Sequence, residues 1–460
     1  MQTRKDLYQA HRLMTQRVAL ALLQGKPGAA ESPLRRTGVG TICGVMVVVL
    51  VAAGFGIAGL LFKGGARNLE KPGLVLIEKE TGAVYAYSAQ DRRLVPFLNY
   101  ASARLAMSTT SIERKMVSSK SLAKYGRGPM TGIQGAPESL PEPRKLTKAP
   151  WSVCVRNPGG GSVVSLIGGR DVGGRALGDD QGVLVQGGPQ TWLVWRNTRM
   201  RISPKAARVL TADQPAPVDQ RWLNALPQGP DFAAPPVPDW GRPSRGPDGA
   251  PAPIGQVFRV APVAGTPARW YVQLVDGLSG VSQSQARLLL DTAGSAPPRE
   301  ISPATAGSRP SRTNLFDRNL PESPPRIAAY RTGEPLCAAY RDTGRLATEA
   351  RFTIGGSLPA PPATPTSAGL DQVVMPGGGT FAGTLSHAGQ KPQAFSLITE
   401  QGVRHPIATP DDVAKLGYAM NAAVPVPANL IQLFRTGPIL ASEAAVRPVP
   451  ATGPHDQPAS

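Results

Sequence analysis

The sequence is poor in the residues and motifs that most enzymes use for chemistry. Its 460 residues include only four histidines and three cysteines, and aromatic residues make up 5%. No histidine falls in an HExxH or a Cys/His spacing typical of zinc sites. The GxxxxGK[ST] motif that cradles nucleotide phosphates is absent, and so is the GxSxG of serine hydrolases. The sequence therefore predicts neither a metal ion nor another cofactor.

One short motif could belong to an enzyme. Ser121-Leu-Ala-Lys124 is an SxxK, the nucleophile motif of penicillin-binding enzymes. These enzymes also need SxN, which is missing, and KTG, which is replaced at best by Arg331-Thr332-Gly333 or Arg435-Thr436-Gly437. Because SxxK is frequent by chance and lies here in a polar connector, we predict no catalytic residue.

Acidic residues are few relative to basic ones, since the formal net charge is +19 and the pI is about 10.3. The Lys and Arg residues are dispersed, and no stacking aromatics interleave with them as they do in RNA-binding sheets. We therefore predict that nucleic acid is not a partner. A solvated basic surface that faces lipid or anionic cell envelope, such as peptidoglycan, fits the charge better.

Charge is wholly absent from residues 38–62, GVGTICGVMVVVLVAAGFGIAGLLF, which run from Gly38 to Phe62. As a helix, this segment would measure about 37 Å at ~1.5 Å per residue, enough to cross a hydrocarbon core of ~30 Å with some tilt. The segment predicts one transmembrane helix. Gly40 and Gly44 form a GxxxG that could pack against another helix, although glycine is common in membrane helices anyway.

Residues 1–37 contain seven Lys and Arg residues and two acids, which predicts a cytoplasmic N-terminus and an exported C-terminal part. Within them, residues 3–24 place Leu7, Met14 and Val18 at helical spacing. Such a basic amphipathic helix can lie on the inner leaflet or dock a cytoplasmic partner. We favour partner docking.

Two of the three cysteines lie in the exported part, where oxidising conditions let disulfides persist. Cys154 and Cys337 each lie in a short apolar strand that follows a proline, and Cys43 lies in the membrane span. We predict a disulfide between Cys154 and Cys337; two free buried thiols are the alternative.

A pattern recurs four times in the exported part. It consists of a short strand, a turn, an aromatic strand, another turn and a helix that carries Ala, then Arg or Lys, then Leu or Val. We interpret each copy as a two-stranded ribbon with a helix, which must pack on its neighbours because a lone hairpin is marginal in water. Convergent patterning is the alternative. The four copies occupy residues 74–107, 183–210, 257–290 and 381–418.

The predicted fold class is α+β, with one N-terminal transmembrane helix followed by an elongated exported region of four ribbon–helix repeats around a disulfide-linked core. In chain order, the predicted segments are a basic amphipathic tail (1–37), the transmembrane helix (38–62), repeat 1 (72–125), core segment A (140–178), repeat 2 (179–215), a Pro-rich linker (216–254), repeat 3 (255–295), core segment B (313–358), repeat 4 with the C-terminal return (373–440) and a disordered tail (441–460).

Several stretches resemble one known family over nearly the whole chain. They include TRKDLYQAHRLMTQRVALALLQG at the N-terminus, PFLNYASARL at 96–105, RGPMTGIQGAP at 127–137 and VPVPANLIQLFRTGPIL at 424–440. These stretches are similar to EccB, a membrane component of the type VII (ESX) secretion system.

The resemblance implies a homodimeric, single-pass inner-membrane protein with a periplasmic domain. It also implies assembly with EccC, an FtsK/SpoIIIE-type ATPase, and with EccD and EccE. A non-catalytic structural subunit of the export complex is therefore the leading hypothesis. An extracytoplasmic ATPase or hydrolase and a cell-wall-binding module are the alternatives.

Overall fold

The computed structural model describes residues 4–24, 33–61, 68–159, 161–263, 265–292, 295–360 and 370–450. The chain separates into two compact units, Met1–Asn68 and Leu69–Ser460.

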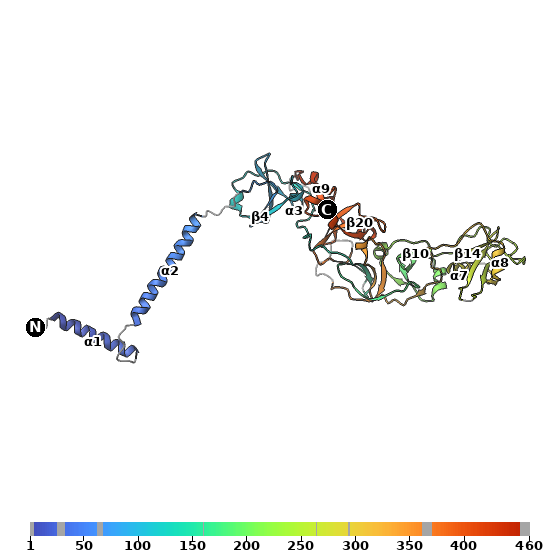
Figure 1. Cartoon of the computed structure of the whole chain (residues 1–460), viewed down its shortest axis with the longest axis horizontal. Coiled ribbons are helices and arrows are strands. Elements are labelled where there is room, and N and C mark those ends of the chain that lie inside the picture. The colour runs from blue at the N-terminus through green and yellow to red at the C-terminus, as the bar shows by residue number, and fades with distance from the viewer. Residues whose placement is uncertain are drawn as a thin grey trace, which may run out of the picture. The chain divides into compact units, whose positions relative to one another are not determined.

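The first unit contains two helices, α1 (Arg4–Gln24) and α2 (Pro33–Leu61) (Figure 1). Helix α2 starts at a proline, which the first turn tolerates because its N–H would have no partner there. Its stretch Gly38–Ile57 is long and apolar enough to cross a membrane, and none of it is buried by the rest of the chain. The predicted span agrees with this helix, except that Phe62 lies outside the described residues.

The second unit contains four small sheets with the same strand order, which we name sheets 1 to 4. In sheet 1, β1 (Leu74–Glu78), β2 (Val84–Ser88) and β3 (Arg93–Phe97) form an antiparallel meander. Helix α3 (Tyr100–Leu105) then leads to β4 (Glu113–Val117), which pairs parallel to β1. The sheet order is therefore β3-β2-β1-β4.

Sheets 2 to 4 repeat this path with the same pairing of the fourth strand to the first. Their elements are, for sheet 2, β8 (Gln181–Gly187), β9 (Gln190–Trp195), β10 (Thr198–Ile202), α5 (Pro204–Leu210) and β11 (Ala216–Pro217); for sheet 3, β12 (Val257–Val260), β13 (Arg269–Gln273), β14 (Leu278–Val281), α7 (Gln283–Leu290) and β15 (Arg299–Glu300); and for sheet 4, β20 (Gly379–Leu385), β21 (Phe395–Thr399), β22 (Val403–Pro406), α9 (Pro410–Lys415) and β23 (Val424–Pro427).

The predicted two-stranded ribbon is therefore wrong, because each sheet has three antiparallel strands and a parallel fourth. The third strand has no clear apolar pattern because it is short and partly polar, as in TRMRI at 198–202. The fourth strand pairs only after the chain has passed through the helix, so nothing near it in sequence marks its partner.

In each sheet the fourth strand is followed by a second short helix and then by a segment that lies parallel to the third strand. The helices are α4 (Ser119–Leu122), α6 (Gln220–Asn224), α8 (Pro303–Ser308) and α10 (Ala428–Ile431). The N–H groups of Gly128, Gly229 and Gly437 then donate to the third strands of sheets 1, 2 and 4, at 2.8, 2.9 and 2.8 Å. A Cβ on Gly437 would lie 2.6 Å from His405 Cε1, so this close approach requires glycine.

Sheet 2 uses residues 216–232 of the Pro-rich segment 216–254 for this purpose, and Trp240 and Ala252 from its later part pack on sheet 3, although the composition of the segment predicts a linker. Trp222 and Phe232 from this segment are 0% and 1% exposed. The N–H of Phe232 donates to Arg201 O at 2.7 Å. Proline fits these positions because an edge segment leaves part of its backbone unpaired.

The helices of the pattern pack in pairs. Helix α3 of sheet 1 lies against α9 of sheet 4 and against α11 (Ser442–Ala445), while α5 of sheet 2 lies against α7 of sheet 3 (Figure 1). Arg104 Nε donates to Lys415 O at 2.8 Å, so this arginine links two sheets. A Cβ on Gly417 would lie 2.8 Å from Arg104 Nη2. The repeated helices therefore join sheets to one another.

In addition to the four small sheets, the second unit contains a central six-stranded sheet with the order β19-β6-β5-β17-β18-β7. Its middle strand β17 is buried along its whole length, which explains its continuous apolar sequence. One further strand, β16 (Arg326–Ile327), joins sheet 2. The central strands are β5 (Trp151–Arg156), β6 (Val163–Gly168), β7 (Arg175–Ala176), β17 (Leu336–Tyr340), β18 (Arg351–Ile354) and β19 (Gln372–Val374).

Candidate functional site

The disulfide joins two adjacent strands of the central sheet. Cys154 on β5 lies opposite Cys337 on β17, and their sulfur atoms are bonded. Both cysteines are 0% exposed and pack against Ile167 and Val172. The bond closes a loop between residues separated by 183 positions, so sheets 2 and 3 lie within the loop. Within the described residues, Cys43 is the free cysteine.

A buried polar cluster on the other face of strand β17 from the disulfide ties the central sheet to sheets 2 and 4. The hydroxyl of Tyr340, on β17, donates to Ala225 O at 3.0 Å. Asn429 Nδ2, on α10, donates to the Tyr340 oxygen at 2.6 Å and also to Ala225 O. Burial raises the pKa of Tyr340 well above its usual range, so the phenol stays neutral and can donate. Trp222 on α6 adds a bond from Nε1 to Val153 O at 3.1 Å.

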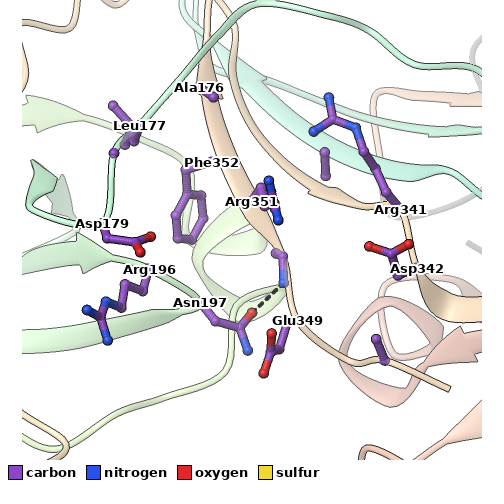
Figure 2. Close-up of a pocket in the computed structure, with 14 residues that line it drawn as sticks. Ala176, Leu177, Asp179, Arg196, Asn197, Arg341, Asp342, Glu349, Arg351 and Phe352 are labelled. Carbon is purple, nitrogen blue, oxygen red and sulfur yellow. Dashed lines mark hydrogen bonds between the residues drawn. The ribbon is translucent and has the colours of Figure 1, made fainter. Parts of the chain in front are cut away.

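A cavity of roughly 580 Å³ lies between the central sheet and the β9–β10 turn, and Figure 2 shows the residues that line it. Asn197 Oδ1 accepts from the Ala350 N–H at 2.6 Å and closes one side of it. Arg341 binds Asp171 at 2.9 and 3.1 Å, and this contact holds the pKa of Asp171 below its usual range. No histidine, cysteine or serine lines the cavity. It offers mixed charges but no nucleophile with an adjacent base.

The SxxK residues do not form an acyl-enzyme site in the described part of the chain. Ser121 is 4% exposed, and its hydroxyl lies 3.1 Å from that of Ser118. Helix α4 ends at Leu122, so Lys124 lies beyond the helix and is exposed. Ser121 and Lys124 therefore do not share one helical face, as a paired nucleophile and base would require.

No group of three His, Cys, Asp or Glu side chains among the described residues could hold a metal ion. Gly40 and Gly44 lie on the α2 segment that none of the other described residues covers, and the space around both Cα atoms is open. This leaves room for a second helix to approach α2 closely. The cluster around Tyr340 could not be predicted from the sequence, because its hydrogen-bonded partners are up to 204 residues apart and no local motif marks them.

The buried side chain of His405 should make the free energy of unfolding of the second unit depend on pH. It is 3% exposed, and its Nδ1 has no hydrogen-bond partner in the part of the chain that the structure describes. Burial lowers the pKa of His405 below the usual 6.5, although a bond with the backbone of Pro438 opposes this. The unfolded chain therefore binds more protons than the folded chain once pH falls through about 6.5.

We expect the free energy of unfolding to fall between pH 7.5 and 5.5 in the native chain, and to fall less in His405→Gln. Carboxylates with lowered pKa, such as Asp412, lose their contribution only at lower pH. Urea unfolding at both pH values measures this difference. Replacement of the exposed His387 by Gln is the control and should leave the native pH dependence intact. If His405→Gln and the native chain showed the same pH dependence, His405 would not be the cause of the loss of stability.

Together, these features define a β-rich protein with one helix that is long and apolar enough to cross a membrane and a central sheet cross-linked by a disulfide. A family model described as "Type VII secretion system ESX-1, transport TM domain B" matches residues 1–450. The chain is 30% identical to the ESX-3 secretion system ATPase EccB3 of Mycobacterium tuberculosis (strain H37Rv), over 97% of this chain and 90% of that protein. It is 28% identical to EccB3 of Mycolicibacterium smegmatis, over 93% and 87%. The chain therefore belongs to the EccB family of type VII secretion components, as its sequence motifs predict.

Two solved structures have the same fold. The EccB3 dimer from the ESX-3 core complex is 26% identical, with a TM-score of 0.63, and the match covers 81% of this chain and 99% of that one. A chain of the intact ESX-5 inner membrane complex matches with a TM-score of 0.64 at 24% identity, over 100% and 98%.

Proposed function

We propose that this protein is a non-catalytic structural subunit of a type VII secretion inner-membrane complex, needed for protein export. The observation that carries the proposal is the family match over residues 1–450, which includes both the apolar helix α2 and the disulfide-linked sheets. Residues 1–37 would lie in the cytoplasm, because basic residues favour that side, and residues 69–450 in the periplasm. An oxidising periplasm would maintain the bond between Cys154 and Cys337.

The proposed assembly is a homodimer within a larger complex. The related EccB3 forms a dimer in the ESX-3 core complex, and another relative belongs to an ESX-5 inner membrane complex with a periplasmic assembly. The exposed apolar side chains of α1, such as Leu7, Met14 and Val18, would dock a cytoplasmic partner. The family resemblance implies assembly with EccC, EccD and EccE.

A scaffold role also suits the architecture of the exported part. The four sheets share one strand order, and we interpret them as four copies of one repeat. Their helices join sheet 1 to sheet 4 and sheet 2 to sheet 3, while the cluster at Tyr340 ties sheets 2 and 4 to the centre. Such internal bonding fixes the shape that a dimer presents to other subunits.

The names of the relatives include the word ATPase, so ATP hydrolysis is the competing function. The sequence contains no GxxxxGK[ST] to place nucleotide phosphates and Mg²⁺. We therefore expect the purified chain to release no phosphate from ATP above the background of a matched preparation from cells that lack it.

Purification of the tagged full-length chain in mild detergent, followed by mass spectrometry, tests the proposed function. The expected result is co-purification of an FtsK/SpoIIIE-type ATPase and a polytopic membrane protein, together with loss of export when the chain is deleted. Recovery of the chain alone, with export intact in the deletion strain, would contradict the proposal. ATP turnover by the isolated chain would favour the enzymatic alternative.

A further inference from the structure

Three of the four sheets extend their third strand with the same kind of segment, which bonds to that strand twice. In sheet 1 the N–H of Gly128 donates to Leu94 O at 2.8 Å, and three residues later the N–H of Thr131 donates to Pro96 O at 2.9 Å. The other two sheets repeat both bonds with the same spacing. The equivalent donors are Gly229 and Phe232 in sheet 2, at 2.9 and 2.7 Å, and Gly437 and Leu440 in sheet 4, both at 2.8 Å.

These three segments also share a short sequence pattern. Proline follows the first donor glycine in each of them, and the second donor is buried. Proline suits such an edge segment because its ring fixes φ near −65° and it needs no N–H partner. The pattern is therefore Gly-Pro-x followed by a buried residue, as in Gly128-Pro129-Met130-Thr131, Gly229-Pro230-Asp231-Phe232 and Gly437-Pro438-Ile439-Leu440.

Sheet 3 makes only the first of the two bonds. The N–H of Ser311 donates to Leu278 O at 2.8 Å, but Arg312 stands where the other segments have proline. Asn314 occupies the position of the second donor, and it is exposed. Its side chain instead accepts from the Phe316 N–H at 3.0 Å. This local bond turns the segment away from the strand, because Asn side chains compete with the sheet for backbone groups.

The strand residue left without this bond is Gly280, on β14. Its N–H and C=O point to the same edge as those of Leu278, because alternate residues of a strand face the same neighbour. On that edge no backbone group of the described residues bonds to Gly280, and the Ser279 hydroxyl lies 3.5 Å from its oxygen. A Cβ on Gly280 would meet no atom within 4 Å. A glycine inside a strand often marks a place where another backbone approaches closely.

A cavity of roughly 290 Å³ lies beside Gly280. Three aromatic side chains form much of its wall: Trp270, Tyr271 and Phe316. Phe316 is exposed although it is a large apolar residue. Arg269 and Glu322 also line the cavity, and their opposite charges balance. The cavity therefore suits an uncharged, apolar side chain next to an unpaired strand edge.

We propose that an extended segment of another protein pairs with Gly280 and places an apolar side chain in this cavity. Such strand addition is a common way to bind a peptide, since main-chain bonds give affinity and side-chain pockets give specificity. The other three sheets show which kind of segment completes this position, namely Gly-Pro-x followed by a residue that becomes buried. The inference goes beyond the scaffold role and does not depend on it.

The last ten residues of this chain fit the position less well. They contain Gly453-Pro454, but Asp456 stands three residues after that glycine. A carboxylate between aromatic rings would lose its hydration without gaining a partner. The proposal therefore assigns the position to a different protein.

A peptide probe tests the site in the full-length chain in detergent. The probe is PQGPDFAA, copied from residues 227–234, which include the segment that fills the equivalent position in sheet 2. We expect the labelled peptide to bind saturably in fluorescence anisotropy. The same peptide with aspartate in place of phenylalanine should bind at least tenfold more weakly. Equal binding of the two peptides, or no binding of either, would overturn the proposal.

Variants of the protein locate the binding at the cavity. Phe316→Ala removes part of the aromatic wall, and Gly280→Leu fills open space beside the cavity, so each should weaken binding at least tenfold. Both positions tolerate the change, because Phe316 is exposed and Gly280 has room for a side chain. Val275→Ala removes an exposed apolar side chain from the β13–β14 turn and should change the affinity less than twofold. Native affinity in both cavity variants would place the binding elsewhere and overturn the proposal.

Photo-crosslinking in cells then identifies the occupant. With p-benzoylphenylalanine in place of Phe316, we expect a cross-link to a different protein, within a segment whose synthetic peptide competes with PQGPDFAA. A cross-link to residues 451–460 of this chain or of a second copy would overturn the assignment to a different protein. The absence of any cross-link would overturn it as well.

Discussion

Replacement of both Cys154 and Cys337 by serine is expected to lower the free energy of unfolding of the exported part by roughly 5 kcal/mol. The bond closes a loop between residues 183 apart, and loop-closure entropy grows slowly with loop length. The figure is an upper one, because a compact denatured chain retains some order. Guanidinium unfolding followed by tryptophan fluorescence measures the loss, since all six tryptophans lie beyond residue 150.

The control for this experiment is Cys43→Ser, which removes a thiol from α2 and should not change the unfolding curve of the exported part. The native chain in reductant should unfold like the double variant once reduced. Both sulfurs are fully buried, so reduction should require prior unfolding and proceed slowly in the absence of denaturant. Equal stability of the double variant and the native chain would contradict a structural role for the bond.

Trp222→Ala is expected to cost about 3–5 kcal/mol, the range for removing a large aromatic side chain from a core. Trp222 is fully buried and joins α6 to the central sheet through its bond to Val153 O and its contact with Phe352. Its loss leaves a cavity at that joint. Because Trp222 lies beside Ala225, whose carbonyl accepts from Tyr340 and Asn429, the damage should extend to the link with sheet 4.

Two variants make the Trp222 result specific. Trp222→Phe keeps most of the volume and loses the indole N–H, so it should cost less than Trp222→Ala. Trp270→Ala removes an indole that is only partly buried, on β13 of sheet 3, and should destabilise less. Similar losses of stability from Trp222→Ala and Trp270→Ala would show that the contact between α6 and the central sheet contributes no more to stability than a partly buried side chain does.

Local sequence patterns predicted those parts of this protein that local physics determines. Twenty-five residues without a charge are typical of a membrane helix, and α2 extends over residues 38–61 of them. The aromatic strands and the following helices were also visible, because their periods of two and about 3.6 residues appear directly in the sequence.

The remaining structure depends on contacts between residues that are distant in sequence. No periodic pattern in the sequence indicates the parallel pairing of β4 with β1, the packing of α3 on α9 or the hydrogen bonds of Tyr340. Composition was misleading at 216–254, where proline suggested a linker although Trp222 and Phe232 are core residues. The open edge at Gly280 could not be predicted, because only the strand pairing of the other three sheets shows that a bond is missing there.

The packing of α3 against α9 and α11 has a consequence for biosynthesis. Sheet 1 is the first sheet to be translated, yet the helices that cover α3 are among the last elements to emerge. A nascent chain that has completed only residues 68–137 therefore lacks the contacts of α9 and α11 with α3, which carries the fully buried Ala101 and Leu105. The packing of sheet 1 is therefore completed only after residue 445 has been made, so sheet 1 cannot reach its final structure while the rest of the chain is still being synthesised.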